Sequence, residues 1–136
     1  MKKMVFLSII LSIILVITFS FLAFASDTNA KNIEFISQYG WKVSENPIEI
    51  VKVTLPPKDD PQYINYQAIQ KEAGLDLDKF SDKPLTRYTY TVLNYPRKIS
   101  EPVRLNLLVY DGLQIAGDVM TVSSDGFMHS LIYPQP

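Results

Sequence analysis

The stretch VRLNLLVYDGLQIAGDVMTV, residues 103–122, decides the fold of this chain. Its two halves, 103–110 and 113–122, are rich in apolar and β-branched residues, a composition that is typical of strands. Between them stands Asp111-Gly112, a pair that tolerates the positive φ angles of a type I′ turn. The stretch therefore predicts an antiparallel hairpin.

Further strands and two helices are predicted around this hairpin. The helical patterns are an apolar spacing that ends at Gly40 and a segment from Pro61 to Gly74, whose first turn Asp60 can cap. Alternating or β-branched runs predict strands in four more segments: residues 41–44, 48–55, 85–95 and 127–133. Trp41 and Tyr39 are expected in the core.

The order of these elements predicts the fold class. Strands follow one another without a sustained alternation of strand and helix, so a parallel sheet is not expected. The sequence predicts an α+β fold, with an antiparallel sheet of about four to six strands and two helices packed on one face. We expect a single domain over residues 31–133, preceded by a short linker at 26–30 and followed by a tail at 134–136.

The start of the chain is typical of an export segment. Residues 4–25 carry no charge, Lys2 and Lys3 precede them, and an A-x-A pattern ends at Ala25. Cleavage near Ala25 would leave a secreted protein. The apolar run is also long enough to span a bilayer as an uncleaved anchor. In both cases the rest of the chain is predicted to be extracytoplasmic.

Charge and cysteine content exclude several classes. Without Lys2 and Lys3 the basic residues fall from 13 to 11 against 14 acidic ones, a net charge of −3. Nucleic acid is therefore not an expected partner, since its binding needs a basic face. The absence of cysteine excludes both disulfides and an acylated lipoprotein anchor. The oligomeric state stays open.

Five segments taken together resemble a known family. In chain order they are YGWKVSENPIEIVKVTLP, YINYQAIQKEAGLDLDKF, LTRYTYTVLNYP, RLNLLVYDGLQIAGDV and DGFMHSL. As a string they resemble a bacterial family known only as domain of unknown function 4830. The resemblance implies a small exported or membrane-attached domain, and it implies no reaction and no functional residue.

His129 is the one histidine, and it is the centre of the catalytic hypothesis. A small hydrolase could use it as a general base, with Asp118 or Asp125 orienting the ring. No G-x-S-x-G elbow accompanies it. In the alternative interpretation, Asp125-Gly126 is a turn and His129 lies on a closing strand.

Asp118 is unexpected within an apolar strand, because a lone buried carboxylate is costly. Three explanations are open. A bulge at Gly117 turns the side chain outward, or Asp118 pairs with Arg87, Arg104 or His129, or it lines a pocket with a raised pKa. We favour the first two.

Tyrosines and arginines on the predicted strands are candidates for binding a ligand or partner. Tyrosine suits surfaces that are partly apolar and partly wet, and arginine recognises acidic groups. The alternative is an aromatic sheet face that packs under the helices. The candidates are Tyr88, Tyr90, Tyr110, Arg87 and Arg104.

No metal or cofactor is expected. A single histidine without cysteine does not make the usual zinc sets. Asp76, Asp78 and Asp82 lack the spacing of a calcium loop, so we expect them to be solvated carboxylates or caps. No phosphate-binding or dinucleotide motif is present.

These observations favour a non-catalytic extracytoplasmic module that binds an unknown protein or a cell-envelope ligand. Two alternatives stay open: the small hydrolase at His129, and a purely structural domain tethered to the membrane through residues 4–25.

Overall fold

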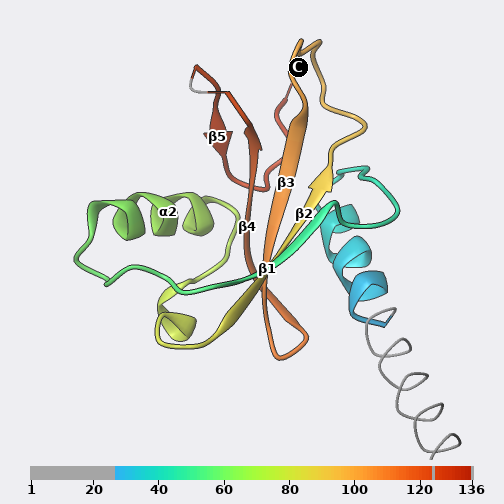
Figure 1. The fold of residues 1–136 in the computed structure, drawn as a ribbon. Coiled ribbons are helices and arrows are strands. Elements are labelled where there is room, and N and C mark those ends of the chain that lie inside the picture. Colours follow the sequence, from blue (N-terminus) through green and yellow to red (C-terminus); the bar gives the residue numbers. More distant parts are fainter. Residues whose placement is uncertain (1–26, 124, 136) are drawn as a thin grey trace, which may run out of the picture. The chain divides into compact units, whose positions relative to one another are not determined.

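The structure is a computed structural model that describes residues 27–123 and 125–135 (Figure 1). It contains an antiparallel sheet in which each strand pairs with the next one along the chain, in the order β1-β2-β3-β4-β5. The strands are β1 (Glu49–Val53), β2 (Leu85–Thr91), β3 (Val103–Tyr110), β4 (Leu113–Thr121) and β5 (Met128–His129). The predicted α+β class, with an antiparallel sheet, is confirmed.

The β3–β4 hairpin forms as its sequence predicts. Asp111 and Gly112 have φ angles of 46° and 77°, the two positive values that a type I′ turn requires. The hairpin register is regular from Val103 to Leu108, and an irregularity follows between Leu108 and Val109.

Helices precede β1 and β2. The first covers residues 27–38. It includes residues 27–30, which we expected to belong to a linker. The second, α2 (Pro61–Glu72), begins where predicted, because the carboxylate of Asp60 accepts a hydrogen bond from the amide of Gln62. A short 3-10 helix, η1 (Asp78–Phe80), follows α2.

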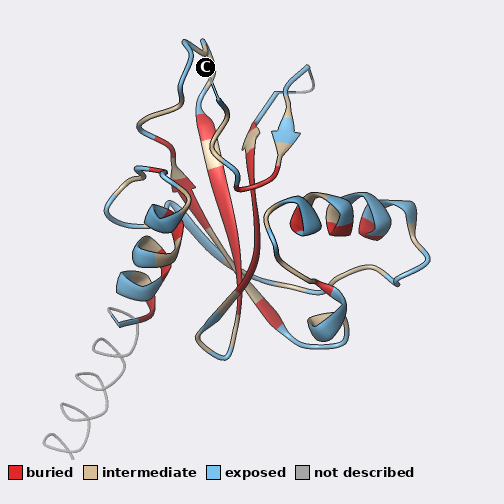
Figure 2. Cartoon of the chain, turned by 180° about the vertical axis from the view of Figure 1, so that it is seen from behind, coloured by how far each residue is buried: buried red, intermediate tan, exposed pale blue. Residues whose placement is uncertain are grey.

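The two helices pack on opposite faces of the sheet, which corrects the expectation that both would lie on one face (Figure 2). Ile36 of the first helix packs in a cluster with Tyr90, whereas Tyr63 of α2 packs in a cluster with Leu108. The reason lies in β3, where residues 105–109 are all buried. A strand that is buried on both faces needs cover on both sides.

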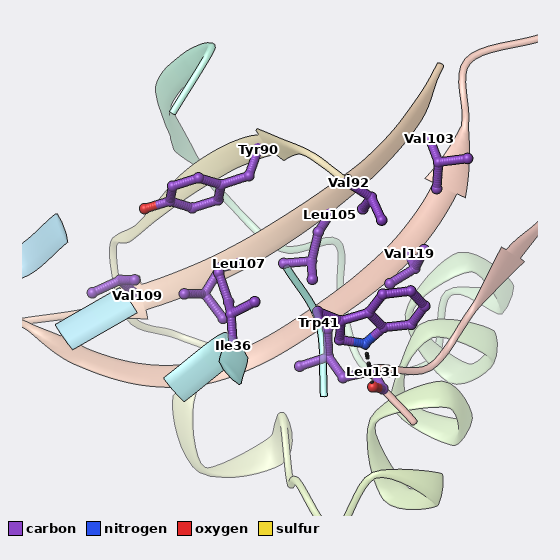
Figure 3. Close-up of a cluster of buried hydrophobic side chains, with 10 residues drawn as sticks. All are labelled: Ile36, Trp41, Tyr90, Val92, Val103, Leu105, Leu107, Val109, Val119 and Leu131. Atoms are coloured by element: carbon purple, nitrogen blue, oxygen red, sulfur yellow. Dashed lines mark hydrogen bonds between the residues drawn. The ribbon is translucent and has the colours of Figure 1, made fainter. Parts of the chain in front are cut away.

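The larger core lies on the face of the first helix (Figure 3). Trp41 is 2% exposed and donates its indole hydrogen to the carbonyl oxygen of Leu131 over 2.6 Å. Tyr39 is partly buried and donates to the carbonyl oxygen of Ala73. The cluster consists of Ile36, Trp41, Tyr90, Val92, Val103, Leu105, Leu107, Val109, Val119 and Leu131.

The shortest predicted strands are reduced in the structure. Residues 41–44 contribute one isolated bridge, between Val43 and Val92. Of residues 127–133, only Met128 and His129 pair with β4.

The predicted export segment, residues 1–25, lies outside the described residues. Among residues 27–123 and 125–135, none of the helices combines the length and the apolar character needed to cross a bilayer.

Candidate functional site

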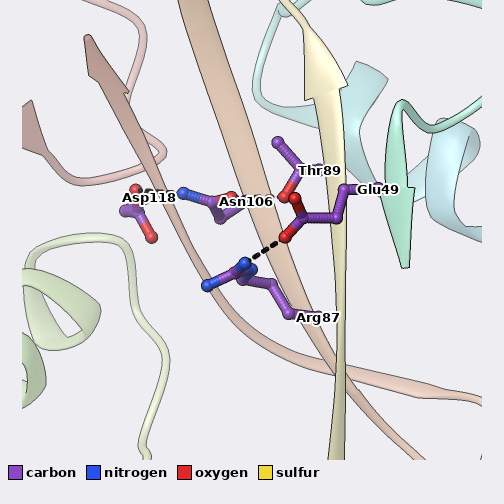
Figure 4. A network of polar contacts seen from close by, with 5 residues as sticks. All are labelled: Glu49, Arg87, Thr89, Asn106 and Asp118. Carbon is purple, nitrogen blue, oxygen red and sulfur yellow. Dashed lines mark hydrogen bonds and ion pairs between the residues drawn. The ribbon is translucent and has the colours of Figure 1, made fainter. Parts of the chain in front are cut away.

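A row of polar side chains crosses the sheet on the face that α2 covers (Figure 4). Glu49 of β1 pairs with Thr89 of β2, Thr89 pairs with Asn106 of β3, and Asn106 pairs with Asp118 of β4. Directly paired residues of antiparallel strands point to the same face. One polar residue from each of four strands therefore lies in a single line.

Hydrogen bonds join this row to α2. Thr89 Oγ1 donates to Asn106 Oδ1 over 2.7 Å, and Asn106 Nδ2 donates to Asp118 Oδ2 over 3.1 Å. From the helix, the hydroxyl of Tyr66 donates to Asp118 Oδ1 over 2.7 Å. The Asp118 carboxylate thus accepts one bond on each oxygen.

Asp118 is only 2% exposed, and burial raises the pKa of its carboxyl group. The hydrogen bonds from Tyr66 and Asn106 act in the opposite direction, as does the charge of Arg87. Burial and the neighbouring carboxylate of Asp118 likewise raise the pKa of Tyr66. Asp118 forms no ion pair within the described residues.

Arg87 extends from β2 beside this row (Figure 4). Its Nη2 forms an ion pair with Glu49. Its Nε is buried and has no acceptor among the described residues. The guanidinium therefore keeps donors that Glu49 does not use.

Two buried glutamines fix α2 against the sheet and the following loop. Gln70 Oε1 accepts the backbone N–H of Gly117, and Gln67 Oε1 accepts that of Leu77, each over 2.8 Å. Gly117 is required by close packing, since an added Cβ would lie 2.8 Å from the carbonyl oxygen of Asn106. These contacts set the rotation of α2 and aim Tyr66 at the sheet.

The residues that α2 buries are not its aliphatic ones. Tyr63, Gln67 and Gln70 are the buried residues, whereas Ile64 is 54% exposed. The spacing of apolar residues in the sequence cannot predict this buried face, because the two glutamines are buried through hydrogen bonds to backbone amides outside the helix.

A pocket of about 500 Å³ lies between α2, the end of β1 and this face of the sheet. Asp118, Asn106, Tyr66 and Arg87 are among its polar lining residues. Apolar side chains make up most of the rest: Val53, Leu55, Pro56, Ile69, Leu77, Leu108, Met120 and Met128. An apolar pocket of this size with a few convergent polar groups has the character of a small-molecule site.

His129 lies on the other face of the sheet. It pairs with Val119 of β4 and stacks on Phe127, with ring centroids 5.5 Å apart. Its Nδ1 is 2.7 Å from the carbonyl oxygen of Ser130, and its Nε2 is 3.0 Å from the hydroxyl of Tyr95. A carbonyl oxygen can only accept, so Nδ1 carries the hydrogen and Nε2 of the neutral ring accepts from Tyr95.

The structure does not bring the three catalytic candidates together. Asp118 and Val119 are consecutive and point to opposite faces, so Asp118 and His129 lie on opposite faces too. Asp125 is exposed in the loop before β5.

Of the three explanations for Asp118, the pocket is the one that the structure bears out. The outward-turning bulge is wrong, because Asp118 is buried and the register shift lies at Ile115 of β4, opposite Leu108 and Val109, instead of at Gly117. The expected pairing with Arg87, Arg104 or His129 is also wrong, because the hydrogen-bond partners are Tyr66 and Asn106.

Of the five binding candidates, only Arg87 lines the pocket. Tyr90 is fully buried and accepts a hydrogen bond from Asn32, while Tyr88 points to the same face and is partly buried. Arg104 Nη1 donates to the hydroxyl oxygen of Thr91, and Tyr110 packs on Phe80. For the two core-facing tyrosines, the packing interpretation fits the structure better.

Two of the three loop aspartates, Asp76 and Asp78, have structural partners. Tyr63 donates to Asp78 Oδ1 over 2.6 Å, and Gln67 Nε2 donates to Asp76 Oδ1 over 2.7 Å. The part of the chain that the structure describes has no cluster of histidine and carboxylate side chains suited to a metal ion.

Comparison with known proteins gives one match. The model of the family Domain of unknown function (DUF4830) matches residues 35–119. The chain belongs to this family. No curated protein and no solved structure matches it.

The matched range contains the polar residues of the pocket in this DUF4830 domain, whereas Met120 and Met128 of its lining lie beyond the range. Tyr66, Arg87, Asn106 and Asp118 all fall within residues 35–119, whereas His129 lies beyond them. Sequence reasoning missed Tyr66, Asn106, Thr89 and Glu49 as site residues. The available signal was a polar residue at the same face position of each strand, and reading it requires the strand register.

Proposed function

We propose that this DUF4830 domain is a non-catalytic binding module outside the cytoplasm, and that the pocket under α2 is its ligand site. One observation carries the proposal: a buried carboxylate and a partly unsatisfied guanidinium lie at the floor of a largely apolar pocket. Groups of this kind fix the orientation of a ligand whose apolar part fills the rest of the space.

The pocket supports binding better than it supports a purely structural role. A buried carboxylate without an ion pair is costly, and an apolar residue of similar size would stabilise the fold more. Buried ionisable groups with shifted pKa values cluster at functional sites, and this favours a ligand site here. The structural alternative offers no reason for this buried carboxylate.

Binding is also favoured over hydrolysis. A hydrolase at His129 needs a nucleophile within reach of Nε2 and a carboxylate at Nδ1. In the described residues these ring atoms contact Tyr95 and a backbone carbonyl instead.

The extracytoplasmic location rests on the uncharged run at residues 4–25 and on the A-x-A pattern at Ala25. Fractionation of cells that express the full chain with a C-terminal tag, with mass spectrometry of its N-terminus, tests it. We expect the protein outside the cytoplasm, either cleaved near Ala25 or held in the membrane. A cytoplasmic protein with an intact N-terminus would contradict this part of the proposal.

A ligand screen tests the pocket itself. The protein is expressed with its N-terminal segment, purified as the host processes it, and screened by ¹H–¹⁵N NMR against a library of small amphipathic compounds. We expect hits whose shift changes cluster at Tyr66, Asn106 and Gly117. Shift changes confined to the face of Trp41 and His129 would contradict the site.

Two tryptophan variants give a matched control. Met128 is 49% exposed and lines the pocket, so Met128→Trp places a large ring at its rim and should alter the affinity of every hit. Leu93 is 66% exposed and does not line the pocket, so Leu93→Trp should leave the affinities unchanged. Equal effects of the two variants would show that the hits bind elsewhere.

A further inference from the structure

Asp118 has unused capacity to accept hydrogen bonds. A carboxylate offers about four lone-pair positions, and Asp118 receives two bonds, from Tyr66 and Asn106. Both donors are neutral, and within the described residues no cation forms an ion pair with the carboxylate. A positively charged donor that entered the pocket would meet an unpaired carboxylate in a largely apolar surrounding, where charge pairs are strong.

Arg87 has unused capacity of the opposite kind. Its Nη2 contacts Glu49, while Nε has no acceptor in the described part of the chain and no bond is formed through Nη1. A guanidinium presents its donors in a fork that matches a carboxylate. An anionic group in the pocket would therefore find donors at Arg87.

The two groups together restrict the charge of the ligand. A ligand with only an ammonium group would pair with Asp118 but would leave the free donors of Arg87 without an acceptor. A ligand with only a carboxylate would find donors at Arg87 but would be repelled by Asp118 and by Glu49, which already pairs with Arg87. A ligand that carries both groups satisfies Asp118 and Arg87 at once, and it adds no net charge to the apolar pocket.

The rest of the lining restricts the body of the ligand. The walls beside these groups are apolar and include Leu55, Ile69, Leu77 and Leu108. A volume of about 500 Å³ accommodates an apolar amino acid or a short apolar peptide. A polar body would lose its hydration against these walls without gaining partners.

We propose that the pocket binds a small zwitterion with an apolar body, with its ammonium group at Asp118 and its carboxylate at Arg87. The chemistry is that of an apolar amino acid or of an apolar dipeptide with free ends. This inference rests on the proposed function of the pocket as a ligand site.

A series of related compounds tests the proposal. Their binding is measured by calorimetry on the protein that is purified after the host has processed its N-terminal segment. The series is leucine, leucyl-leucine, leucinamide, N-acetyl-leucine and glycine. We expect leucine or leucyl-leucine to bind at least about tenfold more tightly than the other three, because leucinamide lacks the carboxylate, N-acetyl-leucine lacks the ammonium group and glycine lacks the apolar body. Leucine and leucyl-leucine differ in the distance between the ammonium group and the carboxylate, so the tighter binder shows which distance the pocket accepts.

Three variants locate the charged contacts. Asp118→Asn should weaken the zwitterion about tenfold while leaving N-acetyl-leucine no weaker, and Arg87→Met should weaken the zwitterion while leaving leucinamide no weaker. Arg104→Met is the matched control, because Arg104 lies on the same face but does not line the pocket. If a variant fails to fold, the compound series on the unaltered protein still decides.

The outcomes separate this inference from the function on which it rests. Leucinamide or N-acetyl-leucine binding as tightly as leucine would overturn the zwitterion. Binding of other library compounds in the pocket, with none of the five binding, would overturn it and leave the ligand site standing. A pocket that binds neither the series nor any library compound would contradict both.

Discussion

Tyr66 donates its hydroxyl hydrogen to Asp118 over 2.7 Å, and this bond joins helix α2 to strand β4 at the floor of the pocket. The hydroxyl end of Tyr66 is buried although the ring is partly exposed. The bond therefore serves two purposes: it satisfies one oxygen of a buried carboxylate, and it fixes the wall of the pocket against its floor.

Removal of this hydroxyl should destabilise the fold. In Tyr66→Phe the Asp118 carboxylate loses one of its two donors, so the free energy of unfolding should fall by about 1–3 kcal/mol. Chemical denaturation measures the change. Tyr110→Phe is the control, because the Tyr110 hydroxyl has no hydrogen-bond partner in the described residues, and it should cost less than about 0.5 kcal/mol. Equal losses in the two variants would show that the Tyr66 bond contributes nothing.

Asp118 should make stability depend on pH with a definite sign. Burial raises the pKa of Asp118 in the folded state above its unfolded value of about 3.9, so the folded state holds the proton more tightly. Its contribution to stability is present below the unfolded pKa and is lost as the pH rises through the folded pKa. Each unit of pKa shift corresponds to about 1.4 kcal/mol.

Asp118→Asn isolates this contribution. The stability of the unaltered protein should fall relative to that of the variant as the pH rises from about 4 through the folded pKa, measured by urea denaturation at each pH. Asp125 lies in an exposed loop, so the stability of Asp125→Asn should change with pH as that of the unaltered protein does. A constant difference between Asp118→Asn and the unaltered protein at every pH would rule out a raised pKa.

Trp41 should be a major contributor to stability. It is 2% exposed, it donates to Leu131, and it packs against Tyr133 with ring centroids 4.7 Å apart. Trp41→Ala should cost about 3–5 kcal/mol, the range for large core truncations. Thermal and urea unfolding measure it, with exposed Leu93→Ala as the control. A loss below about 1 kcal/mol would mean that the indole is not part of the core.

His129 should be found as a single tautomer. The carbonyl oxygen of Ser130 accepts from Nδ1, so the neutral ring should carry its hydrogen there. Long-range ¹H–¹⁵N spectra distinguish the two ring nitrogens directly. In Tyr95→Phe, the Nε2 resonance should shift more than the Nδ1 resonance, because only Nε2 loses its partner. A ring with its hydrogen on Nε2 would contradict the arrangement described here.

Local signals made much of the fold predictable. Asp111-Gly112 fixes the central hairpin, and Asp60-Pro61 fixes the start of α2, because turn and cap geometry depends on residues close in sequence. The placement of the helices was not predictable in this way. Whether the helices share a face depends on which faces of β3 have to be covered, and residues 105–109 are buried on both faces.

The site was predictable only in part. Asp118 and Arg87 are conspicuous in the sequence because charges are rare on apolar strands. Their partners were not predictable, since Tyr66 is 52 residues from Asp118 and Asn106 reaches it through the strand register. The tyrosine-rich strand was misleading for the opposite reason: Tyr90 is an apolar core residue whose hydroxyl is satisfied inside.

The central claim is that Asp118 is a buried carboxyl group at the floor of a ligand pocket. Its most direct test is a ¹³Cγ NMR titration of the aspartates, with Asp118 assigned by comparison with Asp118→Asn. We expect a pKa above the ordinary value of about 3.9 for Asp118, since burial disfavours its charged form. A pKa at or below that value would mean that solvent, an ion pair or the hydrogen bonds outweigh burial, and would contradict the raised pKa on which this account of Asp118 rests.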